Sequence, residues 1–137
     1  METSAETKTP PQYMLLIRNN EWDRNYSPAE LQGALDRIFG WFDNLSESGV
    51  MVDGKPLFER CMRVSRQGGR TVVDGPFAES KEAVAGFVIL NISTMEESVE
   101  IASSAPHLDY GMTIEVRPLA ESCPVYMRTR QYVEALA

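Results

Sequence analysis

The sequence predicts an α+β domain of the ferredoxin-like kind: a βαββαβ order of elements, an antiparallel sheet and both helices on one face. The order of the strong elements indicates this fold, with an apolar strand at 13–17, a helix beginning at Ser27, strands across 62–92, a helix beginning at Thr94 and a strand at 112–119. Because the first strand is apolar on both faces, the face without helices must meet something, most simply a second copy. We therefore expect a homodimer in which two sheets pair as a dimeric α/β barrel.

Length and charge limit the classes of protein to consider. The chain has 137 residues, which suits one domain with a proper core. It carries 13 basic and 20 acidic residues, a formal net charge of −7, so we expect no nucleic-acid partner. No apolar run reaches the ~20 residues of a membrane span and the N-terminus lacks the features of a signal peptide, so no membrane partner is expected either. Cys61 and Cys123 form no disulfide framework, and we expect a cytoplasmic protein.

The domain boundaries follow from composition. Residues 1–11 are polar and end in Pro-Pro, which predicts a disordered N-terminal lead. Residues 12–120 form the folded domain. Residues 121–137 are expected to be a helical extension, and the sequence leaves open whether it covers the sheet or holds a partner.

The first half of the domain contains a strand and a helix with clear signals. The apolar run at 13–17 predicts a central strand buried on both faces. Ser27 suits the N-cap position and Glu30 the N3 acid of a capping box, with Pro28 between them. An apolar stripe follows at spacings of three and four, which predicts a helix packed on the sheet and ended by Gly49.

A hairpin is expected around Gly68-Gly69, because two glycines between β-like runs favour a two-residue turn. Counting outward from this turn pairs Arg63 with Asp74 across the strands. The pair is either an ordinary cross-strand ion pair or a contact that orients Asp74 at the mouth of a cleft. The following Gly75-Pro76 predicts that the strand ends there and that the chain turns.

Two further elements complete the predicted sheet. The apolar run at 83–92 predicts a second central strand. Thr94 and Glu97 suit a second capping box. The segment 112–119 alternates, with Glu115 and Arg117 on the polar face of the last strand.

His107 and Asp74 are the candidate catalytic residues. His107 is the single histidine of the chain and has an ordinary pKa close to neutral, so it could act as acid or base. The alternative is that His107 is an ordinary loop histidine whose side chain is solvated and has no function. Asp74 belongs to the Asp74-Gly75-Pro76-Phe77 segment, which could present a carboxylate at a cleft.

Five more residues are candidates for binding a polar ligand. Arg117 offers a guanidinium fork to a carboxylate, with Glu115 beside it on the strand. The others lie in or opposite the Asp74 segment: Arg63, Glu79 and Lys81. There are alternatives without a ligand. Glu115 and Arg117 could simply neutralise each other at the sheet surface, and the polar residues of the Asp74 segment could belong to a solvated loop.

The sequence contains no pattern for a cofactor or a metal. One histidine and scattered carboxylates have no ligand spacing, so no metal site is predicted. There is no glycine-rich phosphate loop and no nucleophile elbow. We therefore predict no cofactor and leave open whether the protein is an enzyme.

The chain resembles the YCII-related proteins, in particular their DGPF branch. The resemblance runs from Tyr13 to Pro118 and is carried by YMLLI at 13–17, DGPFAESKE at 74–82, GFVIL at 86–90 and IEVRP at 114–118. It implies a ferredoxin-like fold, a dimeric α/β barrel and a polar cleft on each protomer. It does not imply a defined activity, and the association of some members with sigma factors is circumstantial.

The resemblance does not supply a catalytic pair. Members similar to YciI are proposed to use a histidine on the first helix with an aspartate near the end of that helix. This chain has Leu35 and Asp36 at the corresponding helix positions and Glu47 near the helix end. Two hypotheses remain: a dimeric small-molecule-binding or enzyme-like domain with a polar cleft on the sheet face, and a non-catalytic interaction module linked to sigma-factor signalling.

Overall fold

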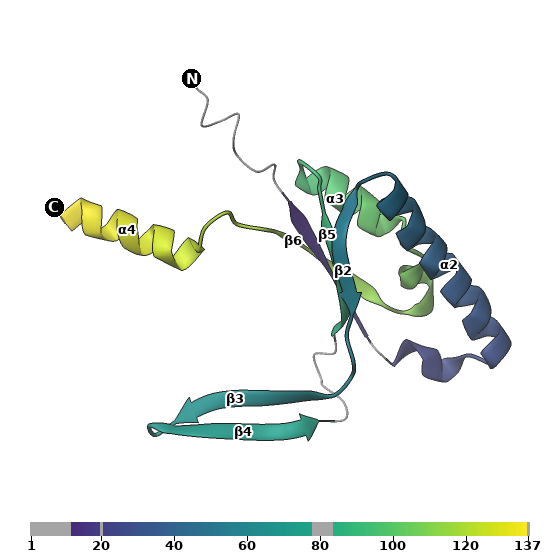
Figure 1. Ribbon diagram of the computed structural model, residues 1–137, viewed down its shortest axis with the longest axis horizontal. Helices are drawn as coiled ribbons and strands as arrows, with labels where there is room; N and C mark the ends of the chain where they lie inside the picture. The colour runs from purple at the N-terminus through teal and green to yellow at the C-terminus, as the bar shows by residue number, and fades with distance from the viewer. Residues whose placement is uncertain (1–11, 20, 78–83, 137) are drawn as a thin grey trace.

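A computed structural model describes residues 12–19, 21–77 and 84–136. It shows a mixed α/β protein with an antiparallel sheet, helices on one face of the sheet, and two elements that project from the other side (Figure 1). The predicted N-terminal lead, residues 1–11, lies outside the described residues.

The main sheet has four strands in the order β2-β5-β1-β6. Their bounds are β1 (Tyr13–Arg18), β2 (Met51–Pro56), β5 (Val84–Leu90) and β6 (Thr113–Pro118). All three neighbouring pairs are antiparallel. The two runs predicted as central strands, β1 and β5, do occupy the middle of the sheet, because long apolar strands need neighbours on both edges.

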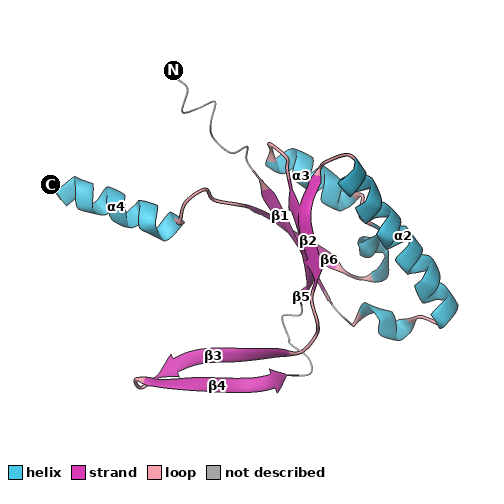
Figure 2. Ribbon diagram, viewed as in Figure 1, coloured by secondary structure: helices cyan, strands magenta, loops and turns pink. Residues whose placement is uncertain are grey.

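Helices α2 (Pro28–Glu47) and α3 (Met95–Ser103) lie on one face of the sheet (Figure 2). The short 3-10 turn η1 (Trp22–Asn25) precedes α2, and a second one, η2 (Pro106–Tyr110), follows α3. The predicted capping box at the start of α2 is confirmed, because the Glu30 N–H donates to Ser27 Oγ and the Ser27 N–H donates to Glu30 Oε1. At α3, Thr94 Oγ1 accepts from the Glu97 N–H, so this N-cap is also confirmed. The reciprocal Glu97 carboxylate contacts the Thr94 hydroxyl instead of its N–H.

The core lies between the helices and the sheet. Its most buried side chains come from β1, β5, α2, α3 and the residue just before β6: Leu15, Ile17, Ile38, Val88, Leu90, Ala102 and Met112. This face of β1 is buried as predicted. The other face of β1 is only partly buried within one chain, because no helix covers it.

Register places four apolar residues on the uncovered face of the sheet. Leu16 lies opposite Phe87, and Met14 lies opposite Ile89. Charged residues border them, since Leu16 also lies opposite Glu115 on β6. We refer to this surface, with Met14, Leu16, Phe87 and Ile89 at its centre, as the bare face.

A separate two-stranded hairpin, β3 (Cys61–Gln67) and β4 (Arg70–Phe77), leaves the sheet after β2. Its predicted register is confirmed, with Gln67 opposite Arg70 and Arg63 opposite Asp74. Gly68 and Gly69 both have positive φ, as a type I′ turn requires.

The prediction that the strand ends at Gly75-Pro76 is wrong, because β4 continues to Phe77. The chain accommodates the two residues in an irregularity of the ladder, where Cys61 pairs with Phe77 and Arg63 with Asp74. Gly75 has a φ of 117°, and a bulge leaves the proline without a required ladder hydrogen bond. The two residues therefore bend the strand instead of ending it.

The C-terminal extension forms a helix, α4 (Pro124–Leu136), which projects on the same side of the sheet as the hairpin (Figure 1). Several of its apolar side chains are exposed, including Val125, Tyr126 and Val133. The hairpin likewise exposes Val64 and Val73. Among the helices of the described residues, none is long and apolar enough to cross a membrane.

Candidate functional site

A cavity of about 310 Å³ lies between α2 and the edge of the sheet formed by β2 and β5. Its helix wall consists of apolar residues one turn apart: Leu35, Ile38, Phe39 and Phe42. Its sheet wall includes Met51, Gly54, Ala85, Gly86, Phe87 and Val88, and His107 and Met112 also contribute. The hollow therefore lies on the helix side and is mainly apolar, in contrast to the polar cleft expected on the bare face.

Two glycines leave space beneath α2. Gly54 and Gly86 sit on neighbouring strands that approach each other closely. A Cβ at Gly86 would lie 2.9 Å from the Lys55 carbonyl oxygen, and one at Gly54 would lie 2.9 Å from the Phe87 carbonyl oxygen. Because a side chain does not fit at either position, the surface of the sheet beneath α2 carries no side chain there. A glycine inside a strand often marks a site where a ligand or another backbone approaches closely.

His107 is buried, in contrast to the solvated loop histidine considered from sequence. It belongs to η2, and its side chain is 3% exposed. Its ring meets the rings of Trp41 and Phe42 edge to face, at centroid separations of 5.3 Å and 5.4 Å. Its Nδ1 has no hydrogen-bond partner among the described residues.

Burial lowers the pKa of His107 from 6.5 to about 4, because the charged imidazolium would lose its hydration among apolar neighbours. The imidazole is therefore neutral at physiological pH. A neutral imidazole has one nitrogen that donates and one that accepts. The buried lining of the cavity therefore includes one polar side chain, a neutral imidazole.

Contacts from α2 hold the η2 segment in place. Arg37 Nη2 donates to Asp109 Oδ2 at 2.7 Å, and Arg37 Nη1 donates to the Tyr110 hydroxyl at 2.9 Å. These two hydrogen bonds raise the pKa of Arg37, the one to Asp109 having the larger effect. Trp41 Nε1 donates to Ser104 Oγ just before η2. Helix α2 thus fixes the segment on which His107 lies.

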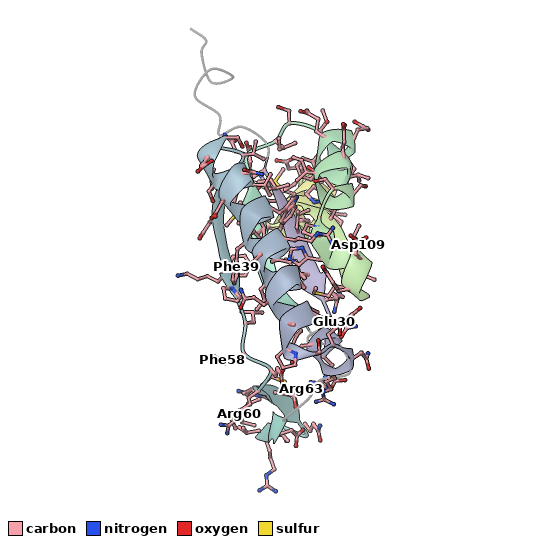
Figure 3. The ribbon with its side chains drawn as sticks, turned by 90° about the vertical axis from the view of Figure 1, so that its right-hand side faces the viewer. Glu30, Phe39, Phe58, Arg60, Arg63 and Asp109 are labelled. Carbon is pink, nitrogen blue, oxygen red and sulfur yellow. The ribbon has the colours of Figure 1, made fainter. Side chains whose placement is uncertain are left out.

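The structure does not bring the predicted catalytic pair together. Asp74 lies on the hairpin opposite Arg63, whereas His107 lies under α2. Figure 3 shows Arg63 at one end of the molecule, well apart from Asp109, which lies two residues after His107. Asp74 and His107 are therefore placed at different parts of the protein.

Two of the predicted ligand-binding residues do meet on β6. Glu115 Oε1 accepts from Arg117 Nη1 at 3.0 Å, and Glu115 Oε2 accepts from Arg18 Nε at 3.0 Å. The hydrogen bond from Arg18, followed by that from Arg117, lowers the pKa of Glu115. This cluster lies at the border of the bare face, on the opposite side of the sheet from the cavity.

The remaining predicted residues are Arg63, Glu79 and Lys81. Arg63 lies on the hairpin, and Glu79 and Lys81 lie outside the described residues. Within the described ranges, no group of three or more histidine, cysteine, aspartate or glutamate residues could hold a metal ion.

The residues that line the cavity were missed by the interpretation of the sequence. The apolar stripe on α2 by itself predicts packing on the sheet, and the sequence around His107 predicts a loop. The available signal was the pair of strand glycines, Gly54 and Gly86, which a strand tolerates poorly without a structural reason.

Comparisons with known proteins find a family model, a relative and a solved structure that are similar to this chain. The model of the YCII-related domain matches residues 12–122. An uncharacterized protein of Rhizobium meliloti (strain 1021) is 39% identical over 54 residues, which cover 38% of this chain and 44% of that protein. The aligned part thus spans less than half the length of this relative.

Among solved structures, similarity is found to 5-chloro-2-hydroxyhydroquinone dehydrochlorinase (TftG) from Burkholderia phenoliruptrix AC1100, in complex with 2,5-dihydroxybenzoquinone. The sequence identity is 13% and the TM-score 0.44, and the match covers 81% of this chain and 95% of the other.

Proposed function

The chain belongs to the YCII-related domain family, and we propose that it is a homodimeric protein that binds a small, mainly apolar molecule in the cavity beneath α2. The observation that supports this most is His107, a buried polar side chain in an otherwise apolar lining. Buried polar groups in native proteins nearly always have partners, and a bound molecule would supply one to the ring nitrogen that Nδ1 leaves accessible.

Binding is better supported than catalysis. The cavity has the size and apolar lining of small-molecule sites, which contain few polar groups. His107 is a weak base because of its lowered pKa, and no carboxylate lines the cavity among the described residues. A neutral imidazole without an orienting carboxylate serves well as a hydrogen-bond partner for a ligand and poorly as a general base.

A thermal-shift screen of small apolar and aromatic metabolites tests this function, with a variant that fills the cavity. A ligand at a hundred times its Kd adds about 2.7 kcal/mol of stability, which raises the Tm by several degrees. Leu35→Trp should remove the shift, because Leu35 lines the cavity. Leu31→Trp, one turn earlier on α2 and outside the cavity lining, is the matched control and should keep it. A hit that persists in Leu35→Trp would place binding elsewhere.

The proposed assembly is a ferredoxin-like domain that pairs as a dimeric α/β barrel. The strand order β2-β5-β1-β6 with both helices on one face supports the ferredoxin-like arrangement. The apolar centre of the bare face supports a second copy as its cover, because large apolar surfaces seldom face water. The hairpin and α4 project on the same side and would flank that copy (Figure 1). The DGPF segment supports the DGPF branch, and the free thiols of Cys61 and Cys123 support a cytoplasmic location.

Leu16→Glu should convert the dimer to a monomer, because it places a charge at the centre of the bare face. The measurement is light scattering coupled to size-exclusion chromatography over a range of concentrations. Thr113→Glu, at the first residue of β6 and opposite Arg18, is the control and should remain dimeric. A wild-type protein that is monomeric at every concentration would contradict the proposed assembly and favour an interaction module.

A further inference from the structure

The lining of the cavity restricts what can enter it. Aromatic side chains contribute much of the wall on the helix side: Trp22, Phe39 and Phe42. The titratable groups among the lining residues are His107 and Lys55, and Lys55 is exposed on the edge strand β2. Because the buried part of the cavity offers no charge to balance an ion, a charged ligand would lose its hydration without compensation. The ligand should therefore be neutral where it is buried.

The volume of the cavity further restricts the class of ligand. An apolar cavity of about 150 Å³ admits a benzene ring. The cavity beneath α2, at about 310 Å³, is roughly twice as large. It therefore suits a molecule with one substituted ring or two fused rings, and flat aromatic faces match the aromatic side chains around it.

His107 adds one polar requirement. Its ring is fixed between Trp41 and Phe42, so it cannot turn freely toward solvent. Nδ1 is enclosed by the protein, so Nε2 is the ring nitrogen left for a molecule in the cavity, and it is a donor in one neutral tautomer and an acceptor in the other. A hydroxyl group can satisfy either tautomer, because it both donates and accepts.

From these observations, and on the basis of the binding function proposed above, we propose that the cavity selects neutral aromatic molecules that carry a hydroxyl group, and that this hydroxyl forms a hydrogen bond with His107. The aromatic wall provides affinity, and His107 provides the preference for the hydroxyl over a hydrocarbon of the same shape.

Two probes that differ by the hydroxyl test this inference: 2-naphthol and naphthalene, titrated into the isotope-labelled protein and followed by NMR. In the wild-type protein, 2-naphthol should bind about tenfold more tightly than naphthalene, as one buried hydrogen bond allows. In His107→Phe this ratio should fall to about one while naphthalene binding is kept. His107→Leu is a second variant with the same expectation, for the case that the larger phenylalanine side chain prevents the protein from folding.

The outcomes separate this inference from the proposed function. Equal affinity of the wild-type protein for both probes, or a preference for 2-naphthol that persists in both His107 variants, would overturn the selection of a hydroxyl while leaving the cavity as a binding site. Failure of both probes to bind, or binding of both that Leu35→Trp does not weaken, would overturn the inference together with the proposed function.

Discussion

Acidification is expected to destabilise the protein through His107, with a loss of about 3 kcal/mol in the free energy of unfolding between the two pKa values of this residue. The folded pKa is about 4 and the ordinary value is 6.5. Between these pH values the unfolded chain takes up a proton that the folded protein does not. The stability contributed by neutral His107 is therefore complete above pH 6.5 and is lost as the pH falls toward about 4.

Urea denaturation measured from about pH 7.5 to about pH 4.5 checks this expectation. Other groups titrate in the same range, so the comparison is with His107→Gln, which has a similar polar side chain without a titrating proton. The wild-type protein should lose stability more steeply than this variant. Parallel pH profiles for the two proteins would show that His107 is not buried in its neutral form.

Leu90→Ala is expected to cost about 2–5 kcal/mol of stability, because it creates a void in the centre of the core. Leu90 lies on the central strand β5 and is 0% exposed. It faces the helices between Tyr13 on β1 and Met51 on β2. Neighbours on both sides hold the backbone, so the site has little freedom to collapse around the smaller side chain.

The matched control is Ile89→Ala, one residue earlier and on the bare face. At high dilution it should cost less than Leu90→Ala, because Ile89 is only partly buried within one chain. Denaturation at two protein concentrations separates the effects: the cost at Leu90 should be the same at both. The cost at Ile89 should increase with concentration in a homodimer, since only the assembled protein buries this side chain. Equal costs at the two positions at high dilution would contradict the assigned faces of β5.

Local signals in the sequence determined much of the fold. The capping box of Ser27 and Glu30 formed as predicted, because its hydrogen bonds join residues three apart. The register of the hairpin also formed as predicted, because two glycines with positive φ fix the turn and each following pair is then counted outward. Such features depend on neighbouring residues and need no information from the rest of the chain.

Other local signals were overridden by pairing between strands. Gly75 and Pro76 favour a turn, yet the ladder between β3 and β4 continues past them to Phe77. A bulge has room for both residues, and the pairing of β3 with β4 compensates for the irregularity. The local sequence is compatible with a turn and with a bulged strand, and pairing with β3 decides between the two.

The candidate site depended entirely on tertiary structure. The sequence showed that His107 is the single histidine and that Glu115 and Arg117 share a face of one strand. It could not show that His107 lies under Trp41 and Phe42, more than sixty positions earlier in the chain, because burial depends on how α2 packs over η2. The cavity likewise combines residues from α2, β2, β5 and η2, and its volume arises only when these elements meet above two strand glycines.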